Sequence, residues 1–416
     1  MRRLEALLLM AVIPPNAARA WAQDSLTLMA ARERVRDGSP LVIAARGDSA
    51  AIVNRGRQAS LRPPGDLSLD VGGEGPFKRP RASLEYVEPL RVGSRTDALK
   101  AIGAADEARE GRRVQVGIAA AQLAVTRAFA RSALLQRRLA VDSEDAAAVS
   151  DLAAESRRRR EMGFATDIDV LRLEAEAGAA QRRVTRDRYS LVAARSTLAA
   201  ELGLSGDSLP PLALDARAPL EDSTALSLIA AINGAGVEAA EQAVARAAAS
   251  TSLAAHSKWT DPGVGGGVGY EEGEPILLAL VRIPIPARNG NADAIAAAEG
   301  ERRAADARLI AARRRAAALL AEARAQRASA LEQMHMLERD LETRRTAESL
   351  ARRRLEEGGP FLQIWLDVRR DRLALERERL DLELALLSAK APGALDEATR
   401  DPLSATAGEG ETGEAP

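Results

Sequence analysis

Hydrophobic and polar residues follow two different patterns along this chain. Residues 94–161 and 290–357 contain no proline and are rich in Ala with scattered Leu and Val. This pattern predicts two helices of about 68 residues, each about 100 Å long. Helices of this length are not stable by intrinsic propensity alone, so they must pack against other helices along their length.

A short segment before each of these stretches alternates apolar with polar residues or glycine, as a strand with one apolar face does. Pairs of strands are therefore predicted within residues 66–92 and 263–286, and glycine-containing segments provide the hairpin connections. The residues that carry the alternation are Leu67, Leu69, Val71, Leu84, Tyr86, Leu90, Val264, Val268 and Tyr270.

The chain also repeats itself. The stretch RRRREMGFATDIDVLRL at 157–173 and the stretch RRRLEEGGPFLQIWLDV at 352–368 share arginines, an acidic residue, a glycine and a leucine at the same spacing. The two strand pairs are separated by the same distance of about 195 residues. Each copy therefore reads as a helix, a strand pair, a long helix, a tight turn and a returning helix.

The repeated turn predicts the tip of a long helical hairpin. Gly163 suits the left-handed conformation that ends a helix. Thr166 and Asp169 fit the capping box that begins the next helix. In the second copy Gly358-Gly359 ends the helix and Pro360 suits the first turn of the returning helix. The strands are thus expected at one end of each hairpin and the tips at the other.

Aromatic residues concentrate in these same two places. Those near the strands suit a bilayer interface or ordinary sheet packing. Those at the tips are either exposed anchors for a partner or close the hairpin by packing. The strand group is Phe77, Tyr86, Trp259 and Tyr270, and the tip group is Phe164, Phe361 and Trp365.

Composition favours long helices over compact cores, since aromatic residues make up 2% and charged residues 29% of the chain. The net charge of −1 gives no field that would recruit nucleic acid. Cysteine is absent, and the two histidines, His256 and His335, fall in different predicted helices. No phosphate-binding loop, nucleophile motif or metal-ligand set stands out. We therefore expect no enzyme, no cofactor and no metal site.

The first residues resemble a secretory signal peptide. Arg2 and Arg3 precede a short apolar run, and Ala18-Arg19-Ala20 and Ala20-Trp21-Ala22 are possible cleavage sites. The alternative is an amphipathic N-terminal helix. No apolar run further along the chain reaches the length of a transmembrane helix.

The order of these elements resembles the TolC-like outer-membrane efflux protein family, closest to the heavy-metal, CzcC-like branch. The residues that carry the resemblance are 26–50, 259–274, 283–307 and the two tips. It implies a homotrimer, in which four strands per chain form a shared 12-stranded β-barrel in outer-membrane lipid and long antiparallel helical hairpins form a periplasmic tunnel. Such a channel passively conducts substrates delivered by a periplasmic membrane-fusion adaptor and an inner-membrane pump.

The resemblance also implies functional positions. The adaptor-docking tips correspond to Met162, Gly163 and Phe164 in the first copy, and to Gly358, Gly359 and Phe361 in the second. Asp367 corresponds to a carboxylate at the tunnel entrance, where a ring of such groups favours cations. The alternative for Asp367 is a surface ion pair with Arg370, an arginine that Asp371 could share.

We therefore expect a mainly α fold with a small β part and an internal duplication. The expected parts are a signal peptide (1–22), a first repeat (23–203, tip 162–166), a linker (204–222), a second repeat (223–389, tip 358–361) and a disordered tail (390–416). The leading function is the exit duct of an efflux system for metal ions or small toxic compounds. The alternatives are a periplasmic coiled-coil adaptor or structural protein, and a cytosolic scaffold if the signal peptide is not genuine.

Overall fold

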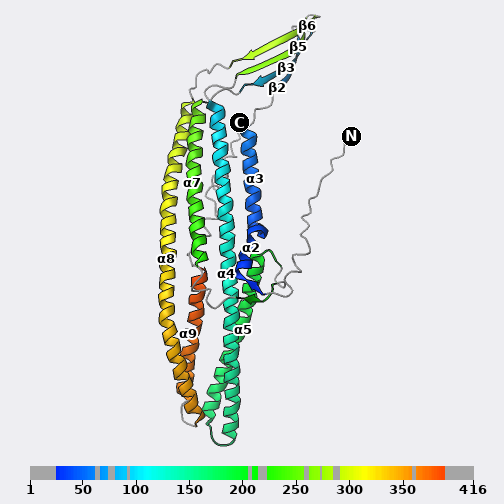
Figure 1. Cartoon of the computed structure of the whole chain (residues 1–416). Helices are drawn as coiled ribbons and strands as arrows, with labels where there is room; N and C mark the ends of the chain where they lie inside the picture. Colours follow the sequence, from blue (N-terminus) through cyan, green and yellow to red (C-terminus); the bar gives the residue numbers. More distant parts are fainter. Residues whose placement is uncertain are drawn as a thin grey trace, which may run out of the picture. The chain divides into compact units, whose positions relative to one another are not determined.

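The structure is a computed structural model, drawn in Figure 1 with colours that follow the sequence. The chain divides into two units. We call them the tip unit (Met1–Pro40, Ala120–Ile229 and Leu320–Pro416) and the sheet unit (Leu41–Ala119 and Ala230–Leu319). The residues that the structure describes are 25–60, 66–73, 80–90, 94–204, 209–213, 223–256, 262–271, 274–283, 291–357 and 362–388.

The sheet unit contains a four-stranded antiparallel sheet in the order β2-β3-β5-β6. Its strands are β2 (Asp66–Gly73), β3 (Pro80–Pro89), β5 (Gly263–Glu271) and β6 (Glu274–Arg282). The predicted strand pairs are therefore confirmed, although Leu90 lies just beyond the end of β3. The central pairing of β3 with β5 joins the two copies of the repeat, with Leu84 opposite Val268 and Tyr86 opposite Gly266.

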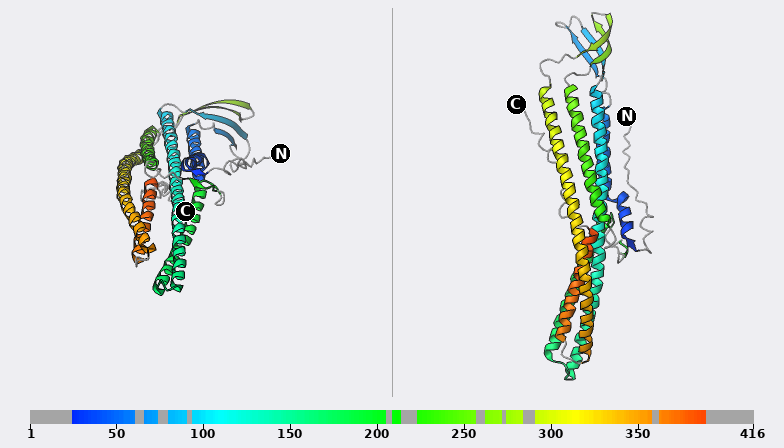
Figure 2. Two further views of the ribbon diagram at one scale, coloured as in Figure 1. Left: turned by 60° about the horizontal axis from the view of Figure 1, so that its bottom comes forward. Right: turned by 60° about the vertical axis from the view of Figure 1, so that its left-hand side comes forward.

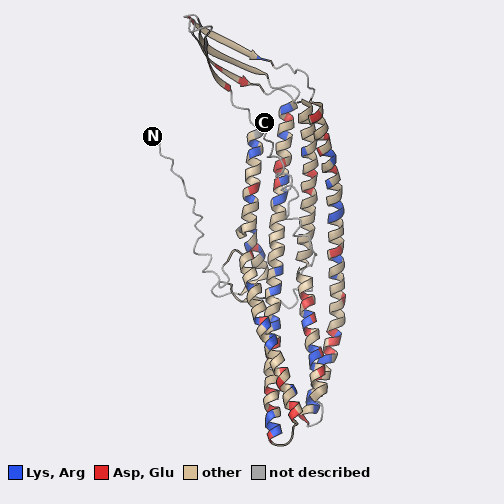
Figure 3. Ribbon diagram, turned by 180° about the vertical axis from the view of Figure 1, so that it is seen from behind, with Lys and Arg blue, Asp and Glu red and all other residues tan. Residues whose placement is uncertain are grey.

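One face of this sheet is apolar and exposed, and the described parts of its strands are mostly uncharged, drawn in tan in Figure 3. Leu69, Leu84, Val268 and Leu277 form one row across all four strands of this face. The exposed residues on this face are Leu67, Leu69, Val71, Leu84, Tyr86, Val264, Val268, Tyr270, Leu277 and Val281. A contiguous apolar surface of this kind marks a contact with lipid or with another protein.

The helices of the sheet unit are joined by small residues and ion pairs. They comprise α3 (Pro40–Ser60) and the sheet-unit segments of α4 (Ser94–Glu161), α7 (Thr224–His256) and α8 (Ala292–Glu356). A Cβ atom added at Gly117 would lie 3.4 Å from Ala45 Cβ, so α3 and α4 approach closely. The ion pairs Arg112–Glu238, Arg246–Asp106 and Arg313–Glu241 have N–O distances of 2.7, 2.8 and 2.8 Å.

The tip unit is built from two helical hairpins (Figure 2). The first pairs the tip-unit segment of α4 with α5 (Asp167–Glu201), and the second pairs that of α8 with α9 (Leu362–Ser388). One apolar cluster contains Ala153, Leu173, Ala351, Trp365 and Leu366, and so draws on all four helices. The side chains in the other apolar clusters are also mostly Ala, Leu and Val, which allows the helices to lie close together.

The tip unit also contains a helix and a small parallel sheet. Helix α2 (Leu28–Gly38) follows β1 (Leu26–Thr27), which pairs with β4 (Leu212–Ala213). Every helix in the described part of the chain is too short or too polar to span a bilayer.

Candidate functional site: the hairpin tip and a buried charge cluster

The first tip is a sharply defined helix ending. Gly163 has φ of +82°, a left-handed conformation that suits glycine. Its N–H donates to Arg160 O at 2.9 Å, and the N–H of Phe164 donates to Arg159 O at 2.7 Å. These two bonds form a Schellman motif, which satisfies carbonyl groups that the end of α4 would otherwise leave free.

The next helix begins three residues later, as the sequence predicts. The Thr166 side chain accepts a hydrogen bond from the Asp169 N–H at 3.2 Å, and the Asp169 carboxylate accepts one from the Thr166 N–H at 3.4 Å. Both bonds of the predicted capping box are therefore present. Arg160 also forms an ion pair with Asp167 across the turn at 3.2 Å. The turn is thus held by its backbone and its polar side chains.

The apolar side chains of the first tip are exposed. Phe164 is 80% exposed, and Met162 is also exposed. Two further exposed residues, Ile168 and Leu171, lie in the first turns of α5. Phe164 therefore does not close the hairpin by packing. Of the two alternatives for this side chain, its exposure favours an anchor for a partner.

The second tip gives a different result. Gly358, Gly359 and Phe361 lie outside the described residues, so their roles stay predictions. Trp365 does not behave as an exposed tip aromatic, because it is 5% exposed and packs in the four-helix apolar cluster. It lies beneath Arg369, whose guanidinium carbon is 5.4 Å from the ring centroid.

Asp367 lies on an exposed face of α9. Its two carboxylate oxygens accept hydrogen bonds from Gln363 Nε2 at 3.1 Å each, and one of them lies 3.7 Å from Arg370 Nη1. Arg370 also pairs with Glu176 of α5. Asp371, for which sharing of Arg370 was possible, pairs with Arg344 of α8 at 3.0 Å.

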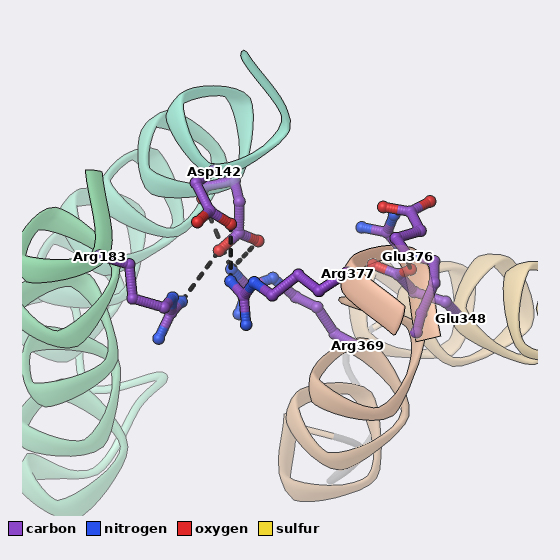
Figure 4. Close-up of polar contacts among 8 residues, drawn as sticks. Asp142, Arg183, Glu348, Arg369, Glu376 and Arg377 are labelled. Carbon is purple, nitrogen blue, oxygen red and sulfur yellow. Dashed lines mark hydrogen bonds and ion pairs between the residues drawn. The ribbon is translucent and has the colours of Figure 1, made fainter. Parts of the chain in front are cut away.

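Between the two hairpins lies a buried charge cluster that sequence reasoning missed (Figure 4). Arg377 of α9 donates to Asp142 of α4 at 2.6 Å. Asp145, one turn further along α4, pairs with Arg369 of α9 and with Arg183 of α5. The side chains of Asp142, Asp145 and Arg369 are at most 3% exposed. Charged pairs therefore connect α4 to α9 where apolar contacts would be the usual choice.

Two carboxyl groups in this cluster interact directly. Burial raises the pKa of Asp187, and its hydrogen bond with Asp142 raises it further. Burial also acts to raise the pKa of Asp142, but the hydrogen bond with Asp187 and the contact with Arg377 lower it overall. The two carboxyl groups therefore shift in opposite directions, with Asp187 the more readily protonated of the pair. Arg138, whose Nε is 3.2 Å from Asp187 Oδ2, balances the charge.

The sequence contained a signal for this cluster. Asp142 and Asp145 are three residues apart, and Ala146, Val149 and Ala153 continue the same stripe of buried positions. Carboxylates within a helical apolar stripe indicate buried charge, because residues three and four apart share a helix face. Within the described residues, no group of His, Cys, Asp and Glu side chains is arranged to hold a metal ion.

The sequence matches no protein-family model and no curated protein. Solved structures do match. A membrane protein from Pseudomonas aeruginosa aligns with a TM-score of 0.74 and 17% identity over 87% of this chain and 88% of that chain. The outer-membrane channel OprN gives 0.67 and 19% over 87% of each chain. The outer-membrane protein VceC from Vibrio cholerae gives 0.62 and 16% over 87% and 95%.

The chain has the fold of the TolC-like channels. The expected fold class is therefore confirmed, with long antiparallel helical hairpins and a small β part. The resemblance to the heavy-metal branch stays a prediction.

Proposed function

We propose that this protein is the outer-membrane exit duct of a tripartite efflux system, with a helical tunnel in the periplasm. The observation that carries the proposal is the sheet in which β3 and β5 join the two repeats and whose apolar face is exposed. A membrane-facing surface accounts for such a face. The alternative, a periplasmic adaptor or structural protein, gives it no role. The fold shared with outer-membrane channels also favours the duct.

The assembly follows from the edges of the sheet. β2 and β6 are its two edge strands, and such edges pair with another chain or must be protected. In the proposed homotrimer, β6 of each copy pairs with β2 of the next, and twelve strands close on themselves in outer-membrane lipid. Closure leaves no strand edge open to the bilayer.

The tips are the proposed contact with a periplasmic membrane-fusion adaptor, which connects the duct to an inner-membrane pump. Met162, Gly163 and Phe164 form the first docking tip, in which an exposed aromatic side chain stands on a rigid turn. Gly358, Gly359 and Phe361 are the proposed second tip. Asp367 is the proposed entrance gate, and its exposed carboxylate supports that role.

The proposed cargo is metal ions or small toxic compounds, with heavy-metal resistance suggested by the family resemblance. The proposed chain organisation is a signal peptide at 1–22, two repeats at 23–203 and 223–389, a linker at 204–222 and a tail at 390–416. The energy for transport comes from the pump, and the duct conducts passively.

The test is fractionation of cells that express the full chain, followed by recordings in planar lipid bilayers. We expect the protein in the outer-membrane fraction, migrating as a trimer until it is heated, and forming conducting channels after reconstitution. A protein recovered in the soluble periplasmic fraction without channel activity would contradict the duct and favour the adaptor or structural alternative.

A further inference from the structure

The face of the sheet opposite the apolar face changes chemically from one edge to the other. The strand register places three complete rows of four residues across it. The β2 and β3 positions are mostly acidic or hydroxyl-bearing, the β5 positions are all glycine, and the β6 positions are all large and aliphatic. From β2 to β6 the rows are Asp66–Val87–Gly265–Leu280, Ser68–Glu85–Gly267–Leu278 and Asp70–Ser83–Gly269–Ile276.

Strand β6 is therefore apolar on both of its faces. Leu277, which is 87% exposed, belongs to the apolar face of the sheet. Ile276, Leu278 and Leu280 lie half-buried on the opposite face. An antiparallel strand with one solvated face alternates apolar and polar residues, as β2 does. A strand that is apolar on both faces indicates that each face meets an apolar partner at some stage.

The glycine column brings the acidic and aliphatic sides of this face together. A Cβ atom added at Gly267 would lie 3.1 Å from Glu85 Cγ, and one added at Gly269 would lie 3.0 Å from Ile276 Cγ1. Glu85 from β3 and Ile276 from β6 thus approach the glycine backbone of β5 from opposite sides. Gly265 and Gly267 cannot be replaced without moving β3, since a Cβ would lie 2.1 Å from Tyr86 O at Gly265 and 2.6 Å from Leu84 O at Gly267.

The charge on this face has one sign over the three complete rows. Within these rows the ionisable residues are Asp66, Asp70 and Glu85, and Ser83 Oγ donates to Glu85 at 3.3 Å. Beyond the row of Asp70, Arg81 lies opposite Gly72. Arg282 lies opposite Gly263, beyond the last complete row. A ligand that matches this face therefore carries positive charge for the carboxylates and an apolar body for the β6 side chains.

We propose that this face contacts and passes organic cations with an apolar body, such as quaternary ammonium compounds. The inference rests on the proposed function, in which this face becomes the inner wall of the conduit. A bare metal ion would use the carboxylates and gain nothing from Ile276, Leu278 and Leu280. An organic anion would be repelled by Asp66, Asp70 and Glu85.

The test uses the full-length protein in planar bilayers, with potassium current as the readout. Tetramethylammonium and tetrabutylammonium carry the same charge and differ in apolar surface. We expect tetrabutylammonium to block the current at a concentration about tenfold lower, because its butyl groups contact the aliphatic side chains of β6.

Three variants separate the two halves of the face. Leu278→Ser should weaken the tetrabutylammonium block several-fold and leave the potassium-to-chloride preference unchanged. Glu85→Gln should weaken the block by both cations and lower that preference. The matched control is Ala279→Ser, which lies on the same strand but on the opposite face and should leave the block unchanged.

The outcomes are distinguishable. This inference would be overturned if the two cations blocked equally. It would also be overturned if Leu278→Ser and Glu85→Gln both left the tetrabutylammonium block intact. Neither result would contradict the proposed channel. A wild-type protein that forms no conducting channel would overturn the proposed function, and this inference with it.

Discussion

Arg377 of α9 donates a hydrogen bond to a carboxylate of α4, Asp142, at 2.6 Å, and the Asp142 side chain is fully buried. This bond joins one helical hairpin of the tip unit to the other. Arg369 makes a second link of the same kind to Asp145. The two hairpins are therefore held by charged pairs for which water offers little competition.

Removal of one partner should be costly. We expect Asp142→Ala to lower the free energy of unfolding by about 3 kcal/mol, because it leaves a partly buried guanidinium without its carboxylate. The measurement is thermal or urea unfolding followed by the helical circular dichroism signal. The matched control is Asp371→Ala, which breaks the exposed pair with Arg344 and should cost under about 1 kcal/mol. Similar losses in both variants would mean that burial of the charge cluster contributes nothing.

Glu383 of α9 gives the stability a dependence on pH. Burial raises its pKa above the ordinary value of a glutamate, and Arg137 and Arg379 oppose the rise. A carboxyl group with a raised pKa in the folded state contributes stability that is complete below its unfolded pKa and is lost as pH rises through its folded pKa. The variant Glu383→Gln should therefore gain stability relative to wild type over the range from about pH 4 upwards. Unfolding temperatures across this range provide the measurement, and a difference that shrinks with pH would contradict it.

The first tip should depend on its glycine. Gly163→Pro cannot adopt a φ of +82° and loses the N–H that donates to Arg160 O. We expect it to abolish efflux in cells and to leave the amount of heat-sensitive trimer unchanged. Gly111→Ala is the control, because this helical glycine has open space around its Cβ position and the change should be neutral. Normal efflux by Gly163→Pro would remove the tip from the docking surface.

A substitution at Phe164 should impair docking to the adaptor without lowering the stability of the fold. Because its side chain is 80% exposed, Phe164→Asp should leave the unfolding temperature unchanged. It should abolish efflux and crosslinking to the adaptor, since a charge replaces the apolar anchor. Trp365→Ala is the informative contrast, because the loss of a buried aromatic should lower the free energy of unfolding by about 3–5 kcal/mol. A Phe164→Asp variant that still crosslinks would place the contact elsewhere.

Asp367 tests the proposed entrance gate. We expect Asp367→Asn to lower the preference for cations in single-channel recordings, because a ring of three carboxylates in the proposed trimer would be neutralised. Asp371→Asn, four residues along α9 and paired with Arg344, should change the preference less. Equal selectivity of wild type and Asp367→Asn would leave the ion pair with Arg370 as the whole role of this residue.

Features governed by local rules could be predicted from the sequence. The span of α4, the left-handed Gly163, the Thr166–Asp169 capping box and the alternating strands all depend on residues close together in the chain. Trp365 could not be placed this way, because its burial depends on which side of α9 meets α4, α5 and α8.

The same limit applies to the buried charges. The apolar stripe around Asp142 and Asp145 indicates that they are buried, but their partners Arg377 and Arg369 come from α9, far away in the sequence. The proposed docking and gate residues are different again, since their roles depend on partner chains.

The pairing of β3 with β5 has a consequence for how fast the protein matures. In the proposed ring of three copies, this seam lies within each chain, and only the seams between β6 and β2 of neighbouring copies form by collision. Two encounters then suffice to join three chains, whereas six separate halves would need five. Duplication within one chain thereby makes three of the six seams intramolecular, where the effective concentration is high. A dilute precursor can then complete its ring before its open strand edges find another partner.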